Sequence, residues 1–333
     1  MTTTGPRVAI IGAGLMGRWH ADAVRRIGGR VTVIVDPDAA AREALGRRHR
    51  GAMVVPDLDP TVVAARVTAA HVCSPLSTHP ATVAALVDAG VHALVEKPFC
   101  ADARSTLTVT SRAQARGVLV CPVHQFLFQD GVRNLVEWLP ELGTVRRVEF
   151  STCSAGAQGG DTEALDALIA EVLPHPLSLI QLLLRMPVAP VRWEVAHPAP
   201  GEFRALSVVG SAIVDVAISA HGRPTENVLR VVADRGSVTA DLFHGFAVRY
   251  SANVSRRDKI AAPFVSSGKV LGGASLNLMR RARRREPAYP GLRELIGAFH
   301  TAIAMGGSSP IPSDAIVDIA TARDRLLAQL KGV

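Results

Sequence analysis

Gly12-Ala13-Gly14-Leu15-Met16-Gly17 follows the apolar run Val8 to Ile11 and leads into a stretch that is typical of a helix. A strand that ends in a glycine turn and opens a helix can accept a pyrophosphate. The glycines let the backbone approach closely, and the helix N-terminus offers N–H groups without intrahelical partners. The pattern alone is common by chance, and its position between a strand and a helix makes it informative. The sequence therefore predicts a dinucleotide-binding turn over residues 12–17.

A second apolar run, Val31 to Val35, ends in Asp36, 24 positions after Gly12. A carboxylate at the tip of the second strand can accept hydrogen bonds from a ribose diol and repel a 2′-phosphate. The pattern therefore favours NAD over NADP as the cofactor. The alternative is an ordinary glycine turn with a solvated aspartate.

Short apolar segments alternate with helical patterns through the first 123 residues. Strands are expected at residues 8–11, 31–35, 52–55, 69–73, 93–95 and 118–123. Continuous apolar strands separated by helices indicate a parallel sheet that is covered on both faces. Residues 1–123 are thus predicted to form an NAD-binding Rossmann domain, an α/β doubly wound fold with its ligand crevice at the carboxyl ends of the strands.

The pattern changes after residue 123, and residues 124–333 are expected to form an α+β domain for substrate binding and oligomerisation. A long helix is expected at residues 163–185, and strands are expected at residues 145–153, 191–196, 203–209, 212–220, 228–233 and 238–242. Short turns between consecutive strands indicate a largely antiparallel open sheet. Residues 253–290 are expected to be irregular, and two C-terminal helices are expected to pack back on the domains. Because both faces of the 212–220 strand carry apolar residues, we expect a homodimer or homotetramer formed through this sheet.

The composition predicts a globular protein of the cytoplasm. Hydrophobic residues make up 48% of the 333 residues, yet no run approaches the ~20 apolar residues of a membrane-spanning helix. The polar start, Met1 to Pro6, leaves no room for a signal peptide before the first strand. Cys73, Cys100, Cys121 and Cys153 form no Cys-x-x-Cys pair, so we expect reduced thiols and no metal site.

The net charge of +8 raises the possibility of a nucleic-acid partner. The positive charge is scattered apart from five arginines, Arg280, Arg281, Arg283, Arg284 and Arg285. None of the few aromatic residues interleaves with this cluster, as base stacking would require. We therefore expect a solvated loop and no nucleic-acid or membrane partner, with a nucleic-acid binder as the alternative.

Three further features carry a family resemblance. Ser74-Pro75-Leu76-Ser77-Thr78-His79 follows the fourth main strand, Glu96-Lys97-Pro98 follows the fifth, and His175 comes four residues after Glu171 on the long helix. In order and spacing these features resemble the glucose-fructose oxidoreductase, inositol dehydrogenase and MocA-like (Gfo/Idh/MocA) oxidoreductase family, over nearly the whole chain. The resemblance implies that Ser74, Pro75, His79, Glu96 and Lys97 contact the NAD cofactor.

The same resemblance implies catalytic roles for Lys97, His175 and Glu171. An ammonium at Lys97 can stabilise the alkoxide that develops as hydride moves to or from the nicotinamide. His175 would take or give the proton, and Glu171, one helical turn away, would share its side of the crevice. Family members often carry Asp at the positions of Glu171 and Pro176, so this chain departs from the pattern. The alternatives are a solvent-facing lysine and an interior histidine beside a proline kink.

A larger departure lies at His124-Gln125-Phe126-Leu127-Phe128, where sugar-acting and polyol-acting relatives usually show Asn and then an Arg-Phe pair. A site for a polyhydroxylated sugar needs many convergent polar groups, because each unmatched buried polar group costs roughly 1 to 3 kcal/mol. Apolar residues in place of the Arg therefore favour a less polar ligand, although they could equally belong to the core. His124, Gln125, Phe126 and Phe128, together with His175, are the candidate substrate contacts.

These observations predict an NAD-dependent oxidoreductase that transfers hydride between nicotinamide and a carbinol, carbonyl or imine carbon. The substrate is expected to be a relatively non-polar small molecule of the kind found in specialised metabolism. A sugar or polyol dehydrogenase is the first alternative. A non-catalytic dinucleotide-binding regulatory protein is the second.

Overall fold

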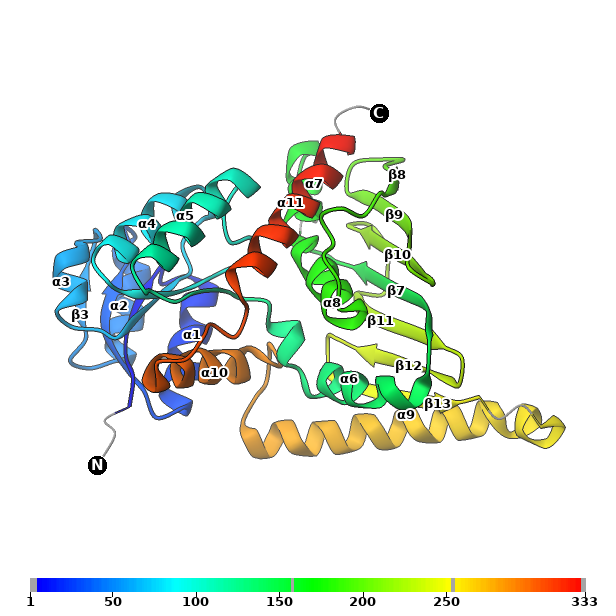
Figure 1. Ribbon diagram of the computed structural model, residues 1–333. Coiled ribbons are helices and arrows are strands. Elements are labelled where there is room, and N and C mark those ends of the chain that lie inside the picture. Colours follow the sequence, from blue (N-terminus) through cyan, green and yellow to red (C-terminus); the bar gives the residue numbers. More distant parts are fainter. Residues whose placement is uncertain (1–4, 157–158, 253–254, 331–333) are drawn as a thin grey trace. The chain divides into compact units, whose positions relative to one another are not determined.

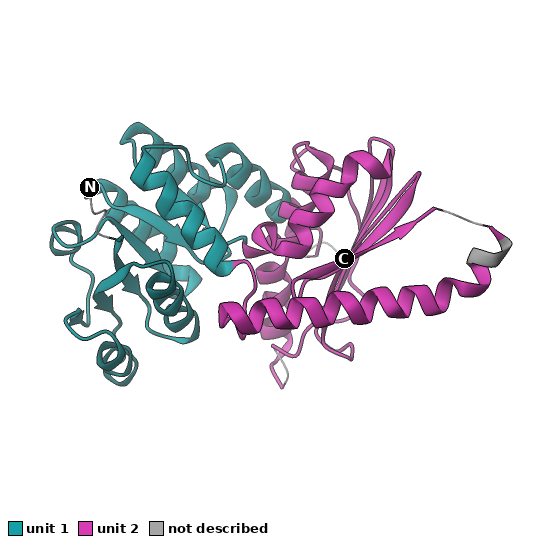
Figure 2. Ribbon diagram, turned by 90° about the horizontal axis from the view of Figure 1, so that it is seen from below, with its two compact units in different colours: residues 1–124, 292–324 teal, residues 125–291, 325–333 magenta. Residues whose placement is uncertain are grey.

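The structure is a computed structural model that describes residues 5–156, 159–252 and 255–330, without the side chains of residues 256–258. The chain divides into two compact units (Figure 2). The first contains residues 1–124 and 292–324, and the second contains residues 125–291 and 325–333. Each unit has its own sheet, and the two are described separately.

The first unit holds a six-stranded sheet with the order β3-β2-β1-β4-β5-β6, in which every pair is parallel. The strands are β1 (Arg7–Ile11), β2 (Arg30–Val35), β3 (Met53–Val55), β4 (Ala69–Val72), β5 (His92–Val95) and β6 (Val120–Pro122). This sheet confirms the predicted Rossmann fold. The strand order reverses between β1 and β4, which is where a doubly wound sheet opens its ligand crevice.

Helices of the first unit come from both ends of the chain. They are α1 (Leu15–Arg26), α2 (Ala39–Arg48), α3 (Pro60–Ala64), the short 3₁₀ turn η1 (Leu76–Thr78), α4 (His79–Asp88), α5 (Ala103–Ala115) and α10 (Leu292–Met305). Aspartate side chains accept backbone N–H groups at the N-termini of α2, α3 and α5, which satisfies donors that the helix leaves unpaired. The next helix, α11 (Ser313–Leu330), is tied to α5 because Asp324 accepts the N–H of Ala103 at 2.7 Å.

The second unit holds a seven-stranded sheet with the order β13-β12-β11-β7-β10-β9-β8. Its strands are β7 (Val145–Cys153), β8 (Glu194–Ala196), β9 (Glu202–Val209), β10 (Ala212–Ser219), β11 (Glu226–Ala233), β12 (Gly236–Asp241) and β13 (Phe246–Ser251). Only β7 and β10 run parallel, so the sheet is largely antiparallel, as predicted. Three helices lie on one face of this sheet (Figure 1), namely α6 (Asp130–Leu142), α7 (Thr162–Val172) and α8 (Pro174–Leu184). Side chains of β10 alternate accordingly, with Val214 and Val216 buried and Ile213 exposed on the other face.

The predicted long helix over residues 163–185 is two helices. α7 ends at Val172 and α8 begins at Pro174, which occupies a first-turn position where its missing N–H has no cost. By length and composition alone, Thr162–Leu184 could cross a membrane. However, 56% of its most apolar window is buried inside the protein, as in the core helix of a soluble protein.

The prediction that residues 253–290 are irregular is wrong for most of this segment. Apart from residues 253–254, which lie outside the described residues, it holds the 29-residue helix α9 (Arg256–Arg284), drawn along the lower edge of Figure 1. Pro263 and several glycines lower the intrinsic helix propensity of this segment, which is why it reads as a loop. The helix lies beside β13, so tertiary contact supports what local propensity does not.

Candidate functional site

At two of its three glycines, the turn between β1 and α1 has room for backbone only. Gly12 has φ of +97°, and a Cβ there would lie 2.6 Å from the carbonyl of Cys73. A Cβ on Gly17 would lie 1.9 Å from the carbonyl oxygen of Gly12, so α1 packs on the turn at this point. In contrast, a Cβ added at Gly14 would have no neighbouring atom within 4 Å. The two outer glycines are therefore required by packing, and Gly14 faces open space.

This open space suits a pyrophosphate. Gly14 is the N-cap of α1 and provides no side-chain cap, and Arg18 N–H is bonded to its carbonyl at 3.1 Å. The N–H groups of Leu15, Met16 and Gly17 precede that bond, so they lie in the helix turn whose donors are available to an anion. Leu15 is 60% exposed beside them. The residues of the turn thus fit a dinucleotide.

Asp36 lies next to the turn, as the sequence predicts. One carboxylate oxygen accepts the N–H of Ala13 at 2.6 Å, and the other accepts the N–H of Asp38 at 2.8 Å. The guanidinium of Arg42 also points to this place, because it donates to the carbonyls of Asp36 at 3.3 Å and Pro37 at 2.8 Å. The strand end therefore presents a fixed carboxylate with a cation close behind it.

His79 connects the two loops that follow β4 and β5. Its ring is buried, with Nε2 2.9 Å from the carbonyl of Ser74 and Nδ1 3.1 Å from the carbonyl of Pro98. These contacts tie the Ser74-Pro75 segment to the Glu96-Lys97-Pro98 segment. The structure thus gives His79 a loop-positioning role, and its contact with the cofactor stays a prediction.

Lys97 follows a buried carboxylate that three histidines support. Oε2 of Glu96 accepts the N–H of Lys97 at 3.2 Å, and Oε1 lies 3.0 Å from Nε2 of His20 on α1. Nδ1 of His20 lies 3.1 Å from Nδ1 of His71 on β4, and Nε2 of His71 lies 3.0 Å from Nε2 of His300 on α10. Sequence reasoning missed this histidine chain, because the three histidines come from three separate elements and share no motif.

The tautomer of His20 sets the direction of this histidine chain. A carboxylate only accepts hydrogen bonds, so a His20 with a single ring proton on Nε2 would accept from His71, which would accept in turn from His300. Burial lowers the pKa of His71 far below its usual range and that of His300 to about 4, and both rings are therefore neutral near pH 7. His71 uses opposite ring nitrogens for its two neighbours, so the three imidazoles do not converge on one point. Among the described residues, no cluster of three or more metal-ligating side chains occurs.

His175 lies in the buried first turn of α8, in the second unit. The ring of Phe126, from the short 3₁₀ turn η2 (Gln125–Phe128), stacks on it with centroids 4.3 Å apart and an interplanar angle of 27°. Ser178 donates its hydroxyl to the carbonyl of His175 at 2.9 Å. Glu171 is exposed near the end of α7, so the helix break separates the two residues that the sequence placed on one long helix.

His124 and Gln125 are both buried. Among the described residues, Nδ1 of His124 and Oε1 of Gln125 have no hydrogen-bond partner. Burial lowers the pKa of His124 to about 4, so its ring is neutral near pH 7. Buried polar atoms without a partner are rare in native proteins and are candidates for ligand contacts. Phe128 is only partly buried.

Comparison with known proteins agrees with this geometry. Residues 6–124 match the model of the GFO_IDH_MocA family, an oxidoreductase family with an NAD-binding Rossmann fold. Over 262 residues the chain is 33% identical to an inositol 2-dehydrogenase of Leifsonia xyli, a match that covers 77% of this chain and 71% of that protein. It is 32% identical over 174 residues to an inositol 2-dehydrogenase of Rhodococcus erythropolis, covering 50% of each. The chain spans half or less of the length of several curated relatives that it matches.

A solved structure supports the fold over the whole chain. The WlbA dehydrogenase of Bordetella pertussis, in complex with NADH and UDP-GlcNAcA, aligns with a TM-score of 0.76. The alignment covers 100% of this chain and 98% of that one, at 15% identity. The glycine turn, the parallel sheet and the extended match to the Leifsonia protein together show that this chain belongs to the Gfo/Idh/MocA oxidoreductase family and carries its NAD-binding Rossmann domain.

Proposed function

We propose that the protein is an NAD(H)-dependent oxidoreductase that interconverts a carbinol and a carbonyl on a small ring-shaped or otherwise compact molecule less hydroxylated than inositol or a free hexose. When bound, the nicotinamide accepts or supplies the hydride. The family and its named dehydrogenase relatives support the reaction class. The observation that carries the substrate class is the stack of Phe126 on His175.

In this proposal Lys97 and His175 have separate roles, charge stabilisation and proton transfer. The ammonium of Lys97 donates a hydrogen bond to the substrate oxygen and stabilises the alkoxide as its carbon loses hydride. His175 takes the proton of the alcohol during oxidation and returns it during reduction. Glu96 accepts the Lys97 N–H and so restricts the backbone at this residue.

The substrate class follows from what surrounds His175. An aromatic ring stacked on the histidine offers carbon atoms and no hydrogen bonds, so it favours an apolar side or substituent on the substrate. The unpartnered atoms of His124 and Gln125 would meet a small number of hydroxyl or carbonyl groups. A few polar contacts against an aromatic wall suit a partly deoxygenated or substituted carbinol better than a free polyol.

A sugar or polyol dehydrogenase is the second candidate, and the inositol dehydrogenases among the relatives favour it. The deciding experiment is a panel of alcohols and ketones assayed with NAD⁺ and NADH. It compares myo-inositol and simple hexoses with deoxy sugars and cyclohexanol-type carbinols. We expect kcat/KM to be higher for the less hydroxylated compounds. Efficient oxidation of myo-inositol or a hexose, without activity on the others, would establish the second candidate instead.

The cofactor preference gives a separate prediction for Asp36. Its fixed carboxylate favours the ribose diol of NAD and repels a 2′-phosphate, and we expect the wild-type protein to bind NADH at least tenfold more tightly than NADPH. Replacing Asp36 with Ala removes this repulsion and leaves Arg42 nearby, so the preference should shrink or reverse. Fluorescence titration of both reduced cofactors measures the two affinities. Asp38→Ala is the matched control, and tighter binding of NADPH by the wild type would refute the assignment.

A further inference from the structure

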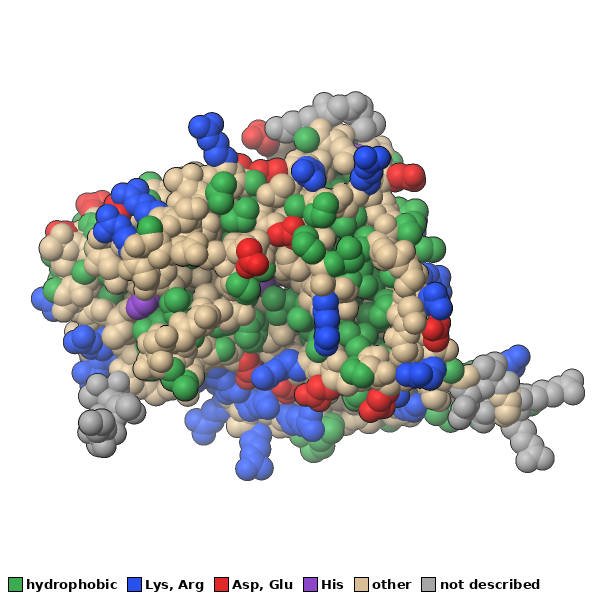
Figure 3. All heavy atoms as spheres, viewed as in Figure 1, with side chains coloured by type: hydrophobic (Ala, Val, Ile, Leu, Met, Phe, Trp, Pro, Cys, Tyr) green, Lys and Arg blue, Asp and Glu red, His purple; other side chains and the backbone are tan. Residues whose placement is uncertain are grey.

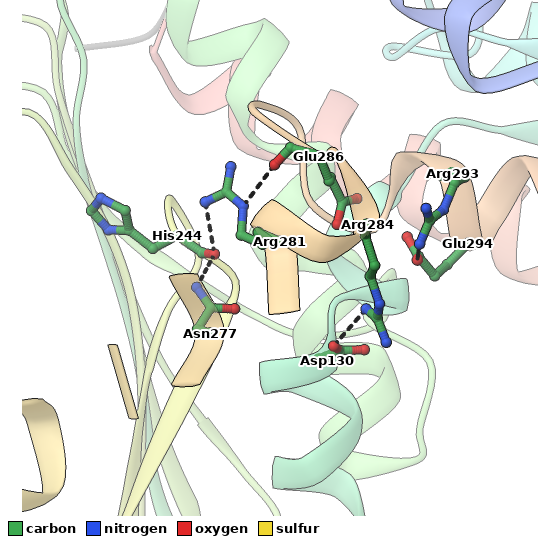
Figure 4. A network of polar contacts seen from close by, with 8 residues as sticks. All are labelled: Asp130, His244, Asn277, Arg281, Arg284, Glu286, Arg293 and Glu294. Carbon is green, nitrogen blue, oxygen red and sulfur yellow. Dashed lines mark hydrogen bonds and ion pairs between the residues drawn. The ribbon is translucent and has the colours of Figure 1, made fainter. Parts of the chain in front are cut away.

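One face of helix α9 packs against the sheet of its own unit. Lys269 donates to the carbonyl of Arg249 at 3.1 Å, and Asn277 donates to the carbonyl of His244 at 2.9 Å. Arg281 reaches the same His244 carbonyl at 3.2 Å (Figure 4). A Cβ on Gly273 would lie 3.3 Å from the ring of Phe246 in β13. The helix is therefore held against the sheet edge along this inner face.

The opposite face of α9 is apolar and exposed. Phe264, Leu271 and Leu278 are 80%, 70% and 69% exposed. At 3.6 residues per turn, Phe264 and Leu271 lie about 160 to 180° around the helix from Gly273. Few soluble proteins leave a continuous apolar stripe of this length uncovered, and such surfaces commonly mark an interaction site.

The spacing of this outer face is that of a paired helix. Its positions follow each other at intervals of three and four residues, and they are Ala261, Phe264, Gly268, Leu271, Ser275, Leu278 and Ala282. A repeat of 3.5 residues is the pattern of a coiled-coil seam, and the exposed side chains of Val265, Leu276 and Met279 widen the apolar surface beside it. Large and small residues alternate along it, and no charged residue interrupts it. Alternating sizes allow two such helices to interdigitate closely.

The seam fits a second copy of itself. Phe264 and Leu278 each lie seven residues from Leu271, so reversing the helix about Leu271 superposes large positions on large positions. Parallel pairing would place the five arginines at positions 280–285 of one copy beside the same five arginines of the other copy. Antiparallel pairing about Leu271 places them opposite residues 257–262, which carry one Arg, one Asp and one Lys, a net charge of +1. Figure 3 shows Lys and Arg side chains gathered over the C-terminal part of α9.

We infer that the outer face of α9 is a self-association surface, on which two copies of this chain pair through antiparallel helices with Leu271 on the two-fold axis. A two-fold contact of this kind is closed and uses the same patch on both copies. It would span residues 261–282, or about 33 Å of helix at 1.5 Å per residue. It is distinct from the sheet contact that the sequence predicts, and it does not depend on the substrate.

Cysteine cross-linking of the full chain tests both the surface and the orientation. Leu271→Cys should give a covalent dimer on mild oxidation at micromolar concentration, as seen on non-reducing gels. Phe264→Cys alone should not, because its copy would lie about 21 Å away along the helix, whereas Phe264→Cys combined with Leu278→Cys should. The wild type, with its four native cysteines, and Arg280→Cys, exposed on another side of α9, are the controls. Efficient cross-linking of Phe264→Cys by itself would overturn the antiparallel arrangement.

Light scattering supplies the second measurement. Leu271→Lys places a charge in the seam and should halve the mass of the assembly, while circular dichroism stays unchanged. An equal mass for the wild type and Leu271→Lys would overturn the inference. So would a wild-type protein that stays monomeric and sediments with anionic vesicles or binds DNA through α9, because the occupant would then be a membrane or a nucleic acid.

Discussion

Replacing Lys97 with Met is expected to lower kcat by about 10²- to 10⁴-fold on the true substrate, the range typical for loss of a group that stabilises the developing charge or assists proton transfer. NADH affinity should change little, because the glycine turn and Asp36 hold the other end of the cofactor. Methionine keeps the length and the apolar stem of the side chain, so the fold should be preserved. Steady-state kinetics and NADH titration on the same preparation separate these two effects.

The matched control is Lys259→Met, which removes an exposed lysine from α9 in the second unit and should leave kcat unchanged. His175→Gln should also slow turnover, with the largest deficit where the histidine would act as the base. If Lys97→Met and His175→Gln both kept near wild-type kcat, the proposed division of roles would be wrong. NADH binding without turnover of any compound by the wild type would instead favour a regulatory dinucleotide-binding protein.

Replacing Gly17 with Ala is expected to destabilise the first unit strongly. Its Cβ would lie 1.9 Å from the carbonyl oxygen of Gly12, and backbone cannot move aside as the end of a side chain can. Overpacking costs about 1 to 3 kcal/mol and occasionally more, and a clash with backbone lies at the upper end of this range. A loss of that size should lower the Tm by roughly 6 to 12 °C in a unit of this length. Thermal unfolding followed by circular dichroism measures the shift.

Gly14→Ala is the companion variant with the opposite expectation. Nothing lies within 4 Å of its Cβ position, so the Tm should stay close to that of the wild type. The added methyl group occupies the place where a pyrophosphate would approach, and we expect the Kd for NADH to rise by about tenfold or more. A large Tm loss in Gly14→Ala, or unchanged NADH binding, would contradict the assignment of this turn.

Much of the first unit could be predicted from the sequence because its signals are local. The strand before the turn, the glycines within it and the helix after it lie within twenty residues, and each constrains the same stretch of backbone. Asp36 could be found because a strand end is readable from an apolar run. The resemblance added Lys97 and His175, whose chemistry depends on motifs.

Other features could not be predicted in this way. The break at Pro174 was missed because a proline in the first turn of a helix and a proline inside a helix look alike in sequence. Helix α9 was missed because Pro263 and its glycines weaken local propensity, and the helix is supported by its contact with β13. Its heptad spacing was nevertheless present in the sequence and is the signal that could have found it.

The sequence by itself determined the Rossmann turn, the parallel sheet around it and the family, since these depend on short-range patterns of apolar residues and glycine. Only the tertiary structure decided which buried side chains meet. It brought His20, His71 and His300 from three separate elements to Glu96, and it placed Phe126 on His175 from 49 residues away. The physical reason is that hydrogen bonds and ring stacking depend on proximity in space, which packing of the whole unit creates and no local spacing encodes.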